Sequence, residues 1–315
     1  MNTMYVGQTI SHYRIVGQIG AGGMGEVYRA EDQNLRRTVA LKCISPSSIR
    51  DDDARQQFIR EARAASALDH PNICTIHDID EAPDGRLFIS MACYDGETLR
   101  QAITRGSLRI EDAIGIARQL AEGVAKAHNE GITHRDLHPG NILITSERIV
   151  KILDFGLATL AGAIPRTRTN VVPGRLAYMS PEQLRGEEAG VPSDIWSFGV
   201  VLFEMLAGRL PWNGDHPAAL FYSIAYEEPI DLATLRKEVP GSLVQLCKQC
   251  LRKNPDERPH SMHDVLAMLG HWPFDITSGG STLMRNLRTR YFVPLLIGVL
   301  LLVLFVLYLI FRPSP

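Results

Sequence analysis

The chain has 315 residues, of which 45 % are hydrophobic and 22 % are charged. These fractions are close to globular averages, and they exclude a disordered acidic tail, a collagen-like fibre and a disulfide-stapled miniprotein. The 33 basic and 35 acidic residues leave a formal net charge of −2. Because nucleic-acid binding relies on clustered Lys and Arg, this balance argues against a nucleic-acid partner. The length suggests about two folding units.

The first part of the chain is predicted to be a small β-rich unit that follows a lead over residues 1–12. Alternating apolar and polar residues with Gly and Asp or Asn breaks indicate short antiparallel strands over 13–44. Strong helix formers at helical spacing predict a helix over 52–68. Residues 75–94 predict two further strands, joined by the turn Pro83-Asp84-Gly85.

From about residue 97 the pattern becomes mostly helical, because apolar residues recur at helical spacing. The predicted helices are 111–130, 193–208, 217–227, 242–251 and 261–269. The sequence therefore predicts an α+β fold, with a small β-rich lobe over 13–94 and a larger helical lobe over 95–271.

The residues after this second lobe have a different composition. A stretch over 272–290, rich in Ser, Thr and Gly, predicts a linker. From Val293 to Phe311 the sequence carries no charge. As a helix this segment would span about 28 Å, close to the hydrocarbon thickness of a bilayer. We therefore expect one transmembrane helix over 291–311, followed by a short tail over 312–315.

The flanks of the apolar segment predict its orientation. Arg285, Arg288 and Arg290 precede it and only Arg312 follows, which by the positive-inside tendency places the soluble part in the cytoplasm. Five cysteines without a framework spacing agree with a reducing compartment. We expect a single-pass protein of the cell membrane that acts on proteins at the cytoplasmic face. A homodimer stays open, because the apolar segment has one glycine, Gly298, and no G-x-x-x-G motif.

The first motif with chemical content is a glycine-rich loop, Gly20-Ala21-Gly22-Gly23-Met24-Gly25, with the spacing G-x-G-x-x-G. This spacing alone is weak, because dinucleotide-binding loops share it. Such loops open a helix, whereas this one continues into the strand-like alternation of Glu26–Ala30. A glycine-rich hairpin between two strands can lay its backbone over phosphates without side-chain clashes.

Two charged residues follow the glycine loop. Lys42 ends the apolar strand Val39–Lys42, and Glu61 lies in the predicted helix 52–68. Taken singly, each is typical of an ordinary surface residue. Next to a phosphate-binding loop, a Lys42–Glu61 pair would hold the ammonium group where it neutralises nucleotide phosphates.

A third set of motifs supplies carboxylates. Residues 134–141 read His-Arg-Asp-Leu-His-Pro-Gly-Asn, in which Asp136 can accept the proton of an attacking hydroxyl and Asn141 can hold a metal ion. Asp154-Phe155-Gly156 ends the apolar run Ile149–Leu153, and a carboxylate at that place can ligate Mg²⁺ that bridges phosphates. Each residue alone is ordinary, but the ordered set is very unlike a chance arrangement.

With these motifs in this order, residues 13–270 resemble a eukaryotic-type protein kinase, in the manner of bacterial membrane-anchored Ser/Thr kinases. Further matches are Ser180-Pro181-Glu182 in the place of A-P-E, Asp194–Gly199 and Arg258. The resemblance implies a bilobal fold and transfer of the γ-phosphoryl group of ATP to Ser and Thr hydroxyls of proteins, its own included. Mg²⁺, or Mn²⁺ in its place, would be the metal. It also implies a structural Glu182–Arg258 pair.

The resemblance also assigns roles to single residues. Asp136 would orient and deprotonate the substrate hydroxyl, and Asn141 and Asp154 would hold the metal. Lys42, braced by Glu61, would contact the α- and β-phosphates, and Met91 would be the gatekeeper beside the adenine. The nucleotide-binding set comprises Ile19, Gly20, Ala21, Gly22, Gly23, Met24, Gly25, Val27, Ala40, Lys42, Met91 and Cys93.

Two positions depart from the family pattern. Ser/Thr kinases usually carry Lys two residues after the catalytic Asp, and this chain has His138 there. They also usually carry Thr directly after the glycine that corresponds to Gly174, and this chain has Arg175 there. One interpretation is that Arg175 supplies the missing fixed charge, with a partly protonated His138 beside it. The other is an ATP-binding pseudokinase or weakly active scaffold. We favour the first, because the other catalytic residues are present.

Arg135, next to the catalytic Asp, suggests regulation. In the family, an Arg at this place pairs with a phosphorylated activation loop. The threonines that could carry the phosphate are Thr167, Thr169 and Thr159. The alternative is a solvated polar loop whose threonines stay unmodified.

Overall fold

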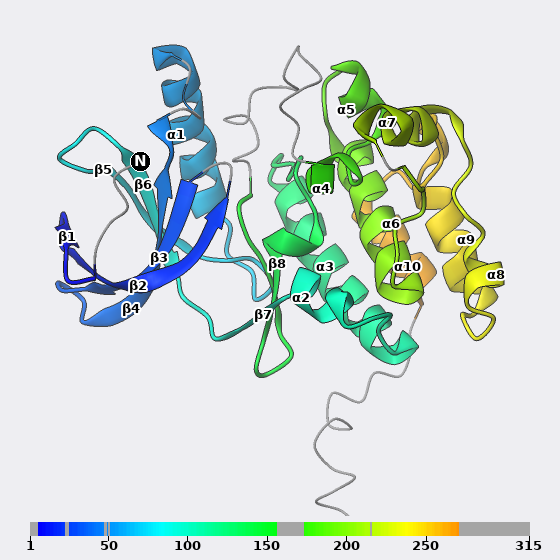
Figure 1. Cartoon of the computed structure of the whole chain (residues 1–315), viewed down its shortest axis with the longest axis horizontal. Coiled ribbons are helices and arrows are strands. Elements are labelled where there is room, and N and C mark those ends of the chain that lie inside the picture. The colour runs from blue at the N-terminus through cyan, green and yellow to red at the C-terminus, as the bar shows by residue number, and fades with distance from the viewer. Residues whose placement is uncertain are drawn as a thin grey trace, which may run out of the picture. The chain divides into compact units, whose positions relative to one another are not determined.

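The computed structural model describes residues 6–22, 25–46, 49, 51–155, 173–214 and 216–270 (Figure 1). These residues belong to one compact unit, Met1–His271. None of the helices in these ranges is both long and apolar enough to cross a bilayer. Several predictions fall outside the described residues: Gly23 and Met24 of the glycine loop, Thr159, Thr167 and Thr169, the linker 272–290, the transmembrane helix 291–311 and the tail 312–315.

The N-terminal lobe is built on an antiparallel sheet of six strands. The alternation of the sequence sends every second side chain into the core, as in β2, where Tyr13 and Ile15 are buried and Arg14 and Val16 are exposed. In spatial order the strands are β1 (Thr9–Ile10), β2 (Tyr13–Gly22), β3 (Gly25–Asp32), β4 (Arg37–Ile44), β6 (Leu87–Ala92) and β5 (Ile76–Glu81).

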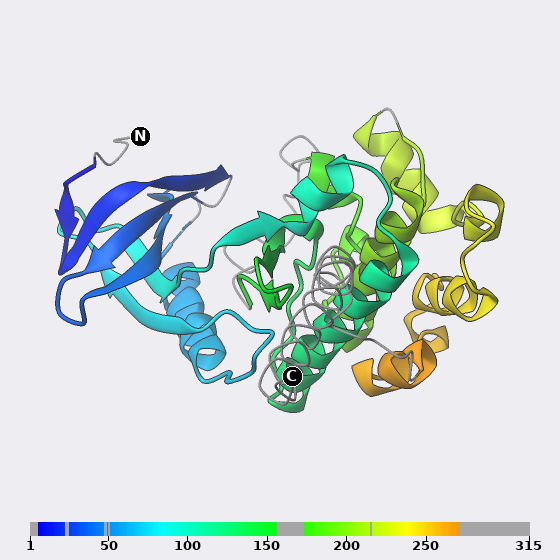
Figure 2. The same cartoon turned by 90° about the horizontal axis from the view of Figure 1, so that it is seen from below.

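Helix α1 (Asp52–Ser66) covers one face of this sheet (Figure 2). Asp51 caps it, because its carboxylate accepts a hydrogen bond from the Ala54 N–H at 2.8 Å. The buried residues Phe58 and Ala62 form one apolar cluster with Ala40 and Met91 of the sheet. This packing fixes the position of Glu61, which lies next to Ala62, relative to β4.

The C-terminal lobe is mainly helical, and α6 forms its centre. Trp196, Phe198 and Phe203 of α6 are almost fully buried, so this helix is apolar on nearly every side. The helices of the lobe are α2 (Leu99–Thr104), α3 (Ile110–Asn129), α4 (Pro173–Leu176), α5 (Pro181–Arg185), α6 (Val191–Ala207), α7 (Pro217–Tyr226), α8 (Leu232–Leu235), α9 (Gly241–Cys250) and α10 (Met262–Leu269). The five predicted helices are thus confirmed, with shifts of one or two residues at their ends.

A second, smaller sheet lies next to the motif of residues 134–141, and the sequence analysis missed it. It pairs β7 (Gly96–Thr98), β8 (Ile142–Thr145) and β9 (Val150–Ile152), and a 3-10 turn over Pro139–Asn141 leads into β8. Strands of three or four residues are too short to show a periodicity. The Leu153 N–H donates to the Asn141 carbonyl at 2.8 Å. This hydrogen bond joins the end of the motif 134–141 to the residue before Asp154, at the open end of the β8–β9 hairpin.

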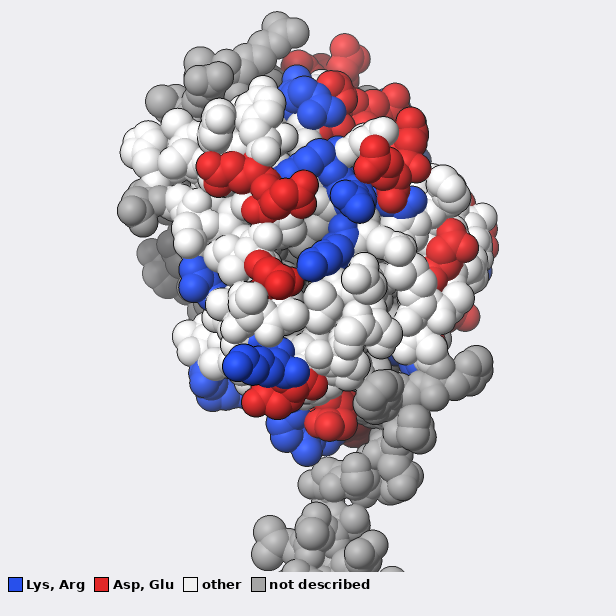
Figure 3. All heavy atoms as spheres, turned by 90° about the vertical axis from the view of Figure 1, so that its right-hand side faces the viewer, with Lys and Arg blue, Asp and Glu red and all other residues white. Residues whose placement is uncertain are grey.

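The face of the helical lobe turned away from the strands carries basic and acidic side chains in alternation (Figure 3).

Candidate active site

The glycine loop forms a hairpin between β2 and β3, as predicted. Gly20 lies opposite Val27 and Gly22 opposite Gly25. At Gly25 the φ angle is 145°, and an added Cβ would lie 1.9 Å from the Cys43 carbonyl oxygen of β4. Only glycine is compatible with this backbone position. The backbone at Gly25 therefore lies very close to the neighbouring strand β4.

The residues predicted to surround the adenine come together on the sheet below this hairpin. Ala40 of β4 lies opposite Met91 of β6. Both are buried in a cluster against which Val27 and Cys93 pack. Burial raises the pKa of the Cys93 thiol, so this side chain is a neutral, apolar contact. Ile19 is half exposed at 50 %, at the outer edge of the hairpin.

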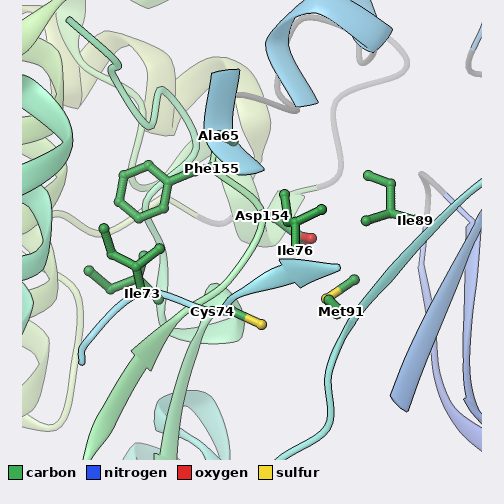
Figure 4. A pocket seen from close by; sticks show the side chains of 9 residues that line it. Ala65, Ile73, Cys74, Ile76, Ile89, Met91, Asp154 and Phe155 are labelled. Carbon is green, nitrogen blue, oxygen red and sulfur yellow. The ribbon is translucent and has the colours of Figure 1, made fainter. Parts of the chain in front are cut away.

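An apolar cavity continues from Met91 into the region between the two lobes (Figure 4). Asp154 is the one charged residue among its lining. Next to it, the Phe155 side chain is buried, and its ring packs edge-on against the His134 ring at 4.7 Å between centroids. Phe155 thus anchors the chain directly after Asp154 and limits where its carboxylate can lie. The lining residues are Ala65, Ile73, Cys74, Ile76, Ile89, Met91, Ile152, Asp154 and Phe155.

Lys42 and Asp154 form a salt bridge between the lobes. The distance from Lys42 Nζ to Asp154 Oδ2 is 2.7 Å, and the side chains are 7 % and 18 % exposed. Burial would raise the pKa of Asp154, but the charge and hydrogen bond of Lys42 outweigh it and lower the pKa. Asp154 is therefore ionised, as a metal ligand must be.

The predicted bracing of Lys42 by Glu61 is wrong in this structure. The Glu61 carboxylate forms an ion pair with Arg135, with Oε1 3.5 Å from Nη1. It also accepts a hydrogen bond from Gln57 Nε2 at 3.2 Å. The reason is competition, because Asp154 is the carboxylate that meets Lys42 and the Arg135 guanidinium reaches Glu61.

The loop that carries Asp136 is held by a buried residue to which the sequence analysis assigned no role. Arg135 has a φ of 64°, which is unfavourable for a residue with a side chain. Asp194, at the start of α6, compensates for this strain. Its Oδ1 accepts the Arg135 N–H at 2.8 Å, and its Oδ2 accepts the His134 N–H at 2.7 Å. A carboxylate near the start of the largely apolar helix α6 was the signal in the sequence.

Asp136 and Asn141 are in direct contact. Asn141 Nδ2 donates to the Asp136 carbonyl at 3.0 Å and approaches its Oδ2 at 3.3 Å. Burial raises the pKa of Asp136, and the charge of Arg175, which pairs with Oδ2, opposes that rise. A carboxylate with a raised pKa is the better proton acceptor.

The donor atoms fit a magnesium ion that is shared with a nucleotide. No cluster of three or more His, Cys, Asp or Glu suited to a metal occurs in the part of the chain that the structure describes. Mg²⁺ at nucleotide sites takes one or two protein oxygens and completes its shell with phosphates and water. Asp154 would offer a carboxylate oxygen and Asn141 its amide oxygen, since the Asn141 nitrogen is bound to Asp136.

The expectation of a partly protonated His138 is also wrong. Burial and the neighbouring charge of Arg175 lower the pKa of His138 to about 3. The imidazole is therefore neutral at physiological pH, and the positive charge that pairs with Asp136 Oδ2 is that of Arg175.

The predicted Glu182–Arg258 pair is confirmed. Two hydrogen bonds of 2.7 and 2.9 Å join the guanidinium to the carboxylate. Burial would raise the pKa of Glu182, but the hydrogen bonds and charge of Arg258 lower it to about 2. The pair links α5 to the segment before α10. The next residue, Gln183, donates from Nε2 to the Arg135 carbonyl at 2.9 Å, so this part of the lobe also supports the catalytic loop.

Residues 13–269 match the sequence model of the protein kinase domain. The chain belongs to the protein kinase family. This kinase domain is 39 % identical over 266 residues to the serine/threonine-protein kinase PrkC of Bacillus subtilis, which covers 84 % of the chain. It is 38 % identical over 263 residues to PknB of Mycolicibacterium smegmatis, covering 82 %. The chain spans only 41 % and 42 % of the lengths of these two relatives.

A solved structure gives the same assignment. The kinase domain of PknI from Mycobacterium tuberculosis superimposes with a TM-score of 0.70 at 27 % sequence identity. The match covers 85 % of this chain and 98 % of that domain. The bilobal fold predicted from the motifs is thus confirmed.

Proposed function

We propose that the protein is a Ser/Thr protein kinase that transfers the γ-phosphoryl group of ATP, with Mg²⁺, to protein hydroxyls. One observation carries this proposal. The Lys42–Asp154 salt bridge of 2.7 Å joins the nucleotide-facing sheet to the hairpin that holds Asp136 and Asn141. Four residues from three separate motifs of the sequence thereby share one site. The relatives named as serine/threonine-protein kinases support the same activity.

In this mechanism the protein positions groups and stabilises charge. The substrate hydroxyl oxygen bonds to the γ-phosphorus as the bond to the β,γ-bridging oxygen breaks, and the hydroxyl proton passes to Asp136. ADP is the leaving group. Lys42 would hold the α- and β-phosphates, and Asn141 and Asp154 would hold Mg²⁺, which would supply positive charge to the phosphates. The glycine hairpin and the apolar wall of Ala40 and Met91 would exclude water from the nucleotide.

We place this kinase at the cell membrane, with the catalytic domain on the cytoplasmic side. The support is in the sequence: an uncharged segment from Val293 to Phe311 with three arginines before it and one after it. Its substrates would then be proteins at the cytoplasmic face. Carbonate extraction of membranes tests this placement: the full chain should stay in the pellet, and a chain ending at residue 290 should not.

Phosphotransfer by the purified full chain tests the activity. We expect incorporation of labelled phosphate into the protein itself and into a general protein substrate, with Mg-ATP required. Asp136→Asn keeps the size of the side chain but removes the proton acceptor, and it should lower the rate at least about 100-fold. Asp69→Asn, which changes an exposed carboxylate on the surface, is the matched control and should leave the rate unchanged.

The second candidate function is an ATP-binding pseudokinase or scaffold, which His138 and Arg175 suggest. Both candidates bind nucleotide, so only turnover separates them. Equal phosphate incorporation by the wild type and Asp136→Asn would reject the kinase.

If the wild type is active, mass spectrometry of the protein would locate its autophosphorylation sites. We expect them at Thr167, Thr169 or Thr159.

A further inference from the structure

The side chain of His138 forms a hydrogen bond with the backbone of Gly140, two residues further along the chain. Its Nδ1 accepts the Gly140 N–H at 3.0 Å and so caps the 3-10 turn Pro139–Asn141. A Cβ at residue 140 would lie 2.9 Å and 3.0 Å from Cε1 and Nδ1 of the ring. A side chain at position 140 would therefore push the folded-back ring out of place, and the two residues form a matched pair.

The other nitrogen of the ring faces Arg175. The Arg175 Nε–H points to His138 Nε2 at 3.4 Å, and the same Nε2 lies 3.8 Å from Asp136 Oδ2. The ring of His138 thus lies between the turn that Gly140 forms and the guanidinium next to the catalytic carboxylate.

The cation at this place comes from another element. Arg175 of α4 forms an ion pair with Asp136 Oδ2 and lies against the His138 ring. Lys42 and Arg135 pair with carboxylates other than Asp136, namely Asp154 and Glu61. A guanidinium keeps its charge across the physiological pH range and presents a planar fork that matches phosphate oxygens.

We propose that His138, Gly140 and Arg175 form one module in which Arg175 supplies the positive charge for the transferring phosphoryl group. His138, held by Gly140, is a positioning residue that keeps the guanidinium beside Asp136. This inference rests on the proposed kinase activity and deepens it, because it names the residues that replace a lysine at position 138. The module works only as a set: a lysine at 138 would put a second cation about 4 Å from Arg175, where two like charges repel.

Steady-state kinetics of the full chain with Mg-ATP test the module. Arg175→Met should lower kcat about 100-fold, with little change in the KM for ATP, because a charge used in the transition state is lost. Arg175→Lys keeps the charge and should retain more than about a tenth of kcat. His138→Lys should lower kcat rather than raise it. Arg209→Thr, an exposed arginine that contacts Asn213, is the matched control and should stay within about twofold.

The decisive variant is the double change His138→Lys with Arg175→Thr. It should recover most of the activity that His138→Lys or Arg175→Thr loses alone. His138→Lys alone puts two cations beside Asp136 and Arg175→Thr alone leaves none, whereas the double variant has one. Gly140→Ala should lower kcat in the wild type, where the ring needs the space, but not in the double variant. Thermal unfolding of each variant checks that the fold is kept. A purely structural role of these residues would produce neither the recovery nor this dependence on background.

A pH profile gives a second readout. The charged and titratable groups around the His138 ring are Asp136, Arg175, His134, Arg100, Asp154 and Tyr178. If Arg175 carries the charge, kcat should not fall between pH 6 and 8, where an ordinary histidine of pKa about 6.5 loses its proton. A fall through that range would overturn the proposal, as would an Arg175→Met variant with wild-type kcat. A wild type no faster than Asp136→Asn would overturn the kinase activity and the module together.

Discussion

Two ion pairs of this kinase domain differ in how completely their hydrogen-bonding capacity is used. In the pair Arg258–Glu182, all five guanidinium hydrogens have acceptors: two on Glu182 and three on backbone carbonyls. Ser193 Oγ adds a hydrogen bond of 2.7 Å to the carboxylate. In the pair Lys42–Asp154, the ammonium has one polar partner among the described residues, although it carries three hydrogens.

The difference separates a structural pair from a binding pair. A buried pair whose donors are all satisfied is costly to break and has no capacity left for a ligand. Lys42 still has two hydrogens to give, and Asp154 is ionised beside it. A nucleotide phosphate and a metal ion can complete these groups without the loss of existing bonds.

The largest effect should follow from breaking the saturated pair. Arg258→Met leaves Glu182 buried without its partner, and we expect the free energy of unfolding to fall by about 3–5 kcal/mol. Lys42→Met should cost less than half as much, because one contact is lost and Asp154, 18 % exposed, can meet water. Urea unfolding of both variants checks this. An equal loss would show that the Lys42–Asp154 pair is structural as well.

The pH dependence of stability provides a control for the Arg258–Glu182 pair. The pKa of Glu182 is lowered in the fold from its ordinary 4.5 to about 2. A lowered carboxylate pKa means that the pair stabilises the fold above pH 4.5 and that this contribution disappears as the pH falls toward 2. The difference in stability between wild type and Glu182→Gln should therefore be large at pH 6 and shrink below pH 4.5. A difference that stayed constant down to pH 2 would contradict the assignment.

The sequence alone was sufficient for the features that are written in contiguous motifs. The glycine hairpin, Lys42, Asp136 and Asp154 all stand in short patterns whose spacing reflects local geometry. The structure places Gly22 opposite Gly25 in this hairpin. The Glu182–Arg258 pair was also predicted, although only through the family resemblance.

What the sequence did not contain were choices between partners that are distant in the chain. Glu61 could meet either Lys42 or Arg135, and only the placement of α1 against the catalytic loop decides for Arg135. The protonation of His138 likewise depends on burial and on Arg175, which is brought to it from another element. Asp194 is one of two carboxylates in a largely apolar helix, and only the fold brings the His134 and Arg135 N–H groups to it.

The smallest effect on stability is expected for a third ion pair, Glu61–Arg135, which we expect to be the weakest of the three. Its closest atoms are 3.5 Å apart, and the two side chains are 20 % and 35 % exposed. Because water screens such a pair, Glu61→Gln should change the free energy of unfolding by no more than about 1 kcal/mol. Urea unfolding beside Arg258→Met measures this on the same scale. A loss above about 2 kcal/mol would mean that Glu61 is held as firmly as Glu182. A small loss leaves Glu61 able to exchange partners at little cost in stability, a freedom that the saturated Arg258–Glu182 pair lacks.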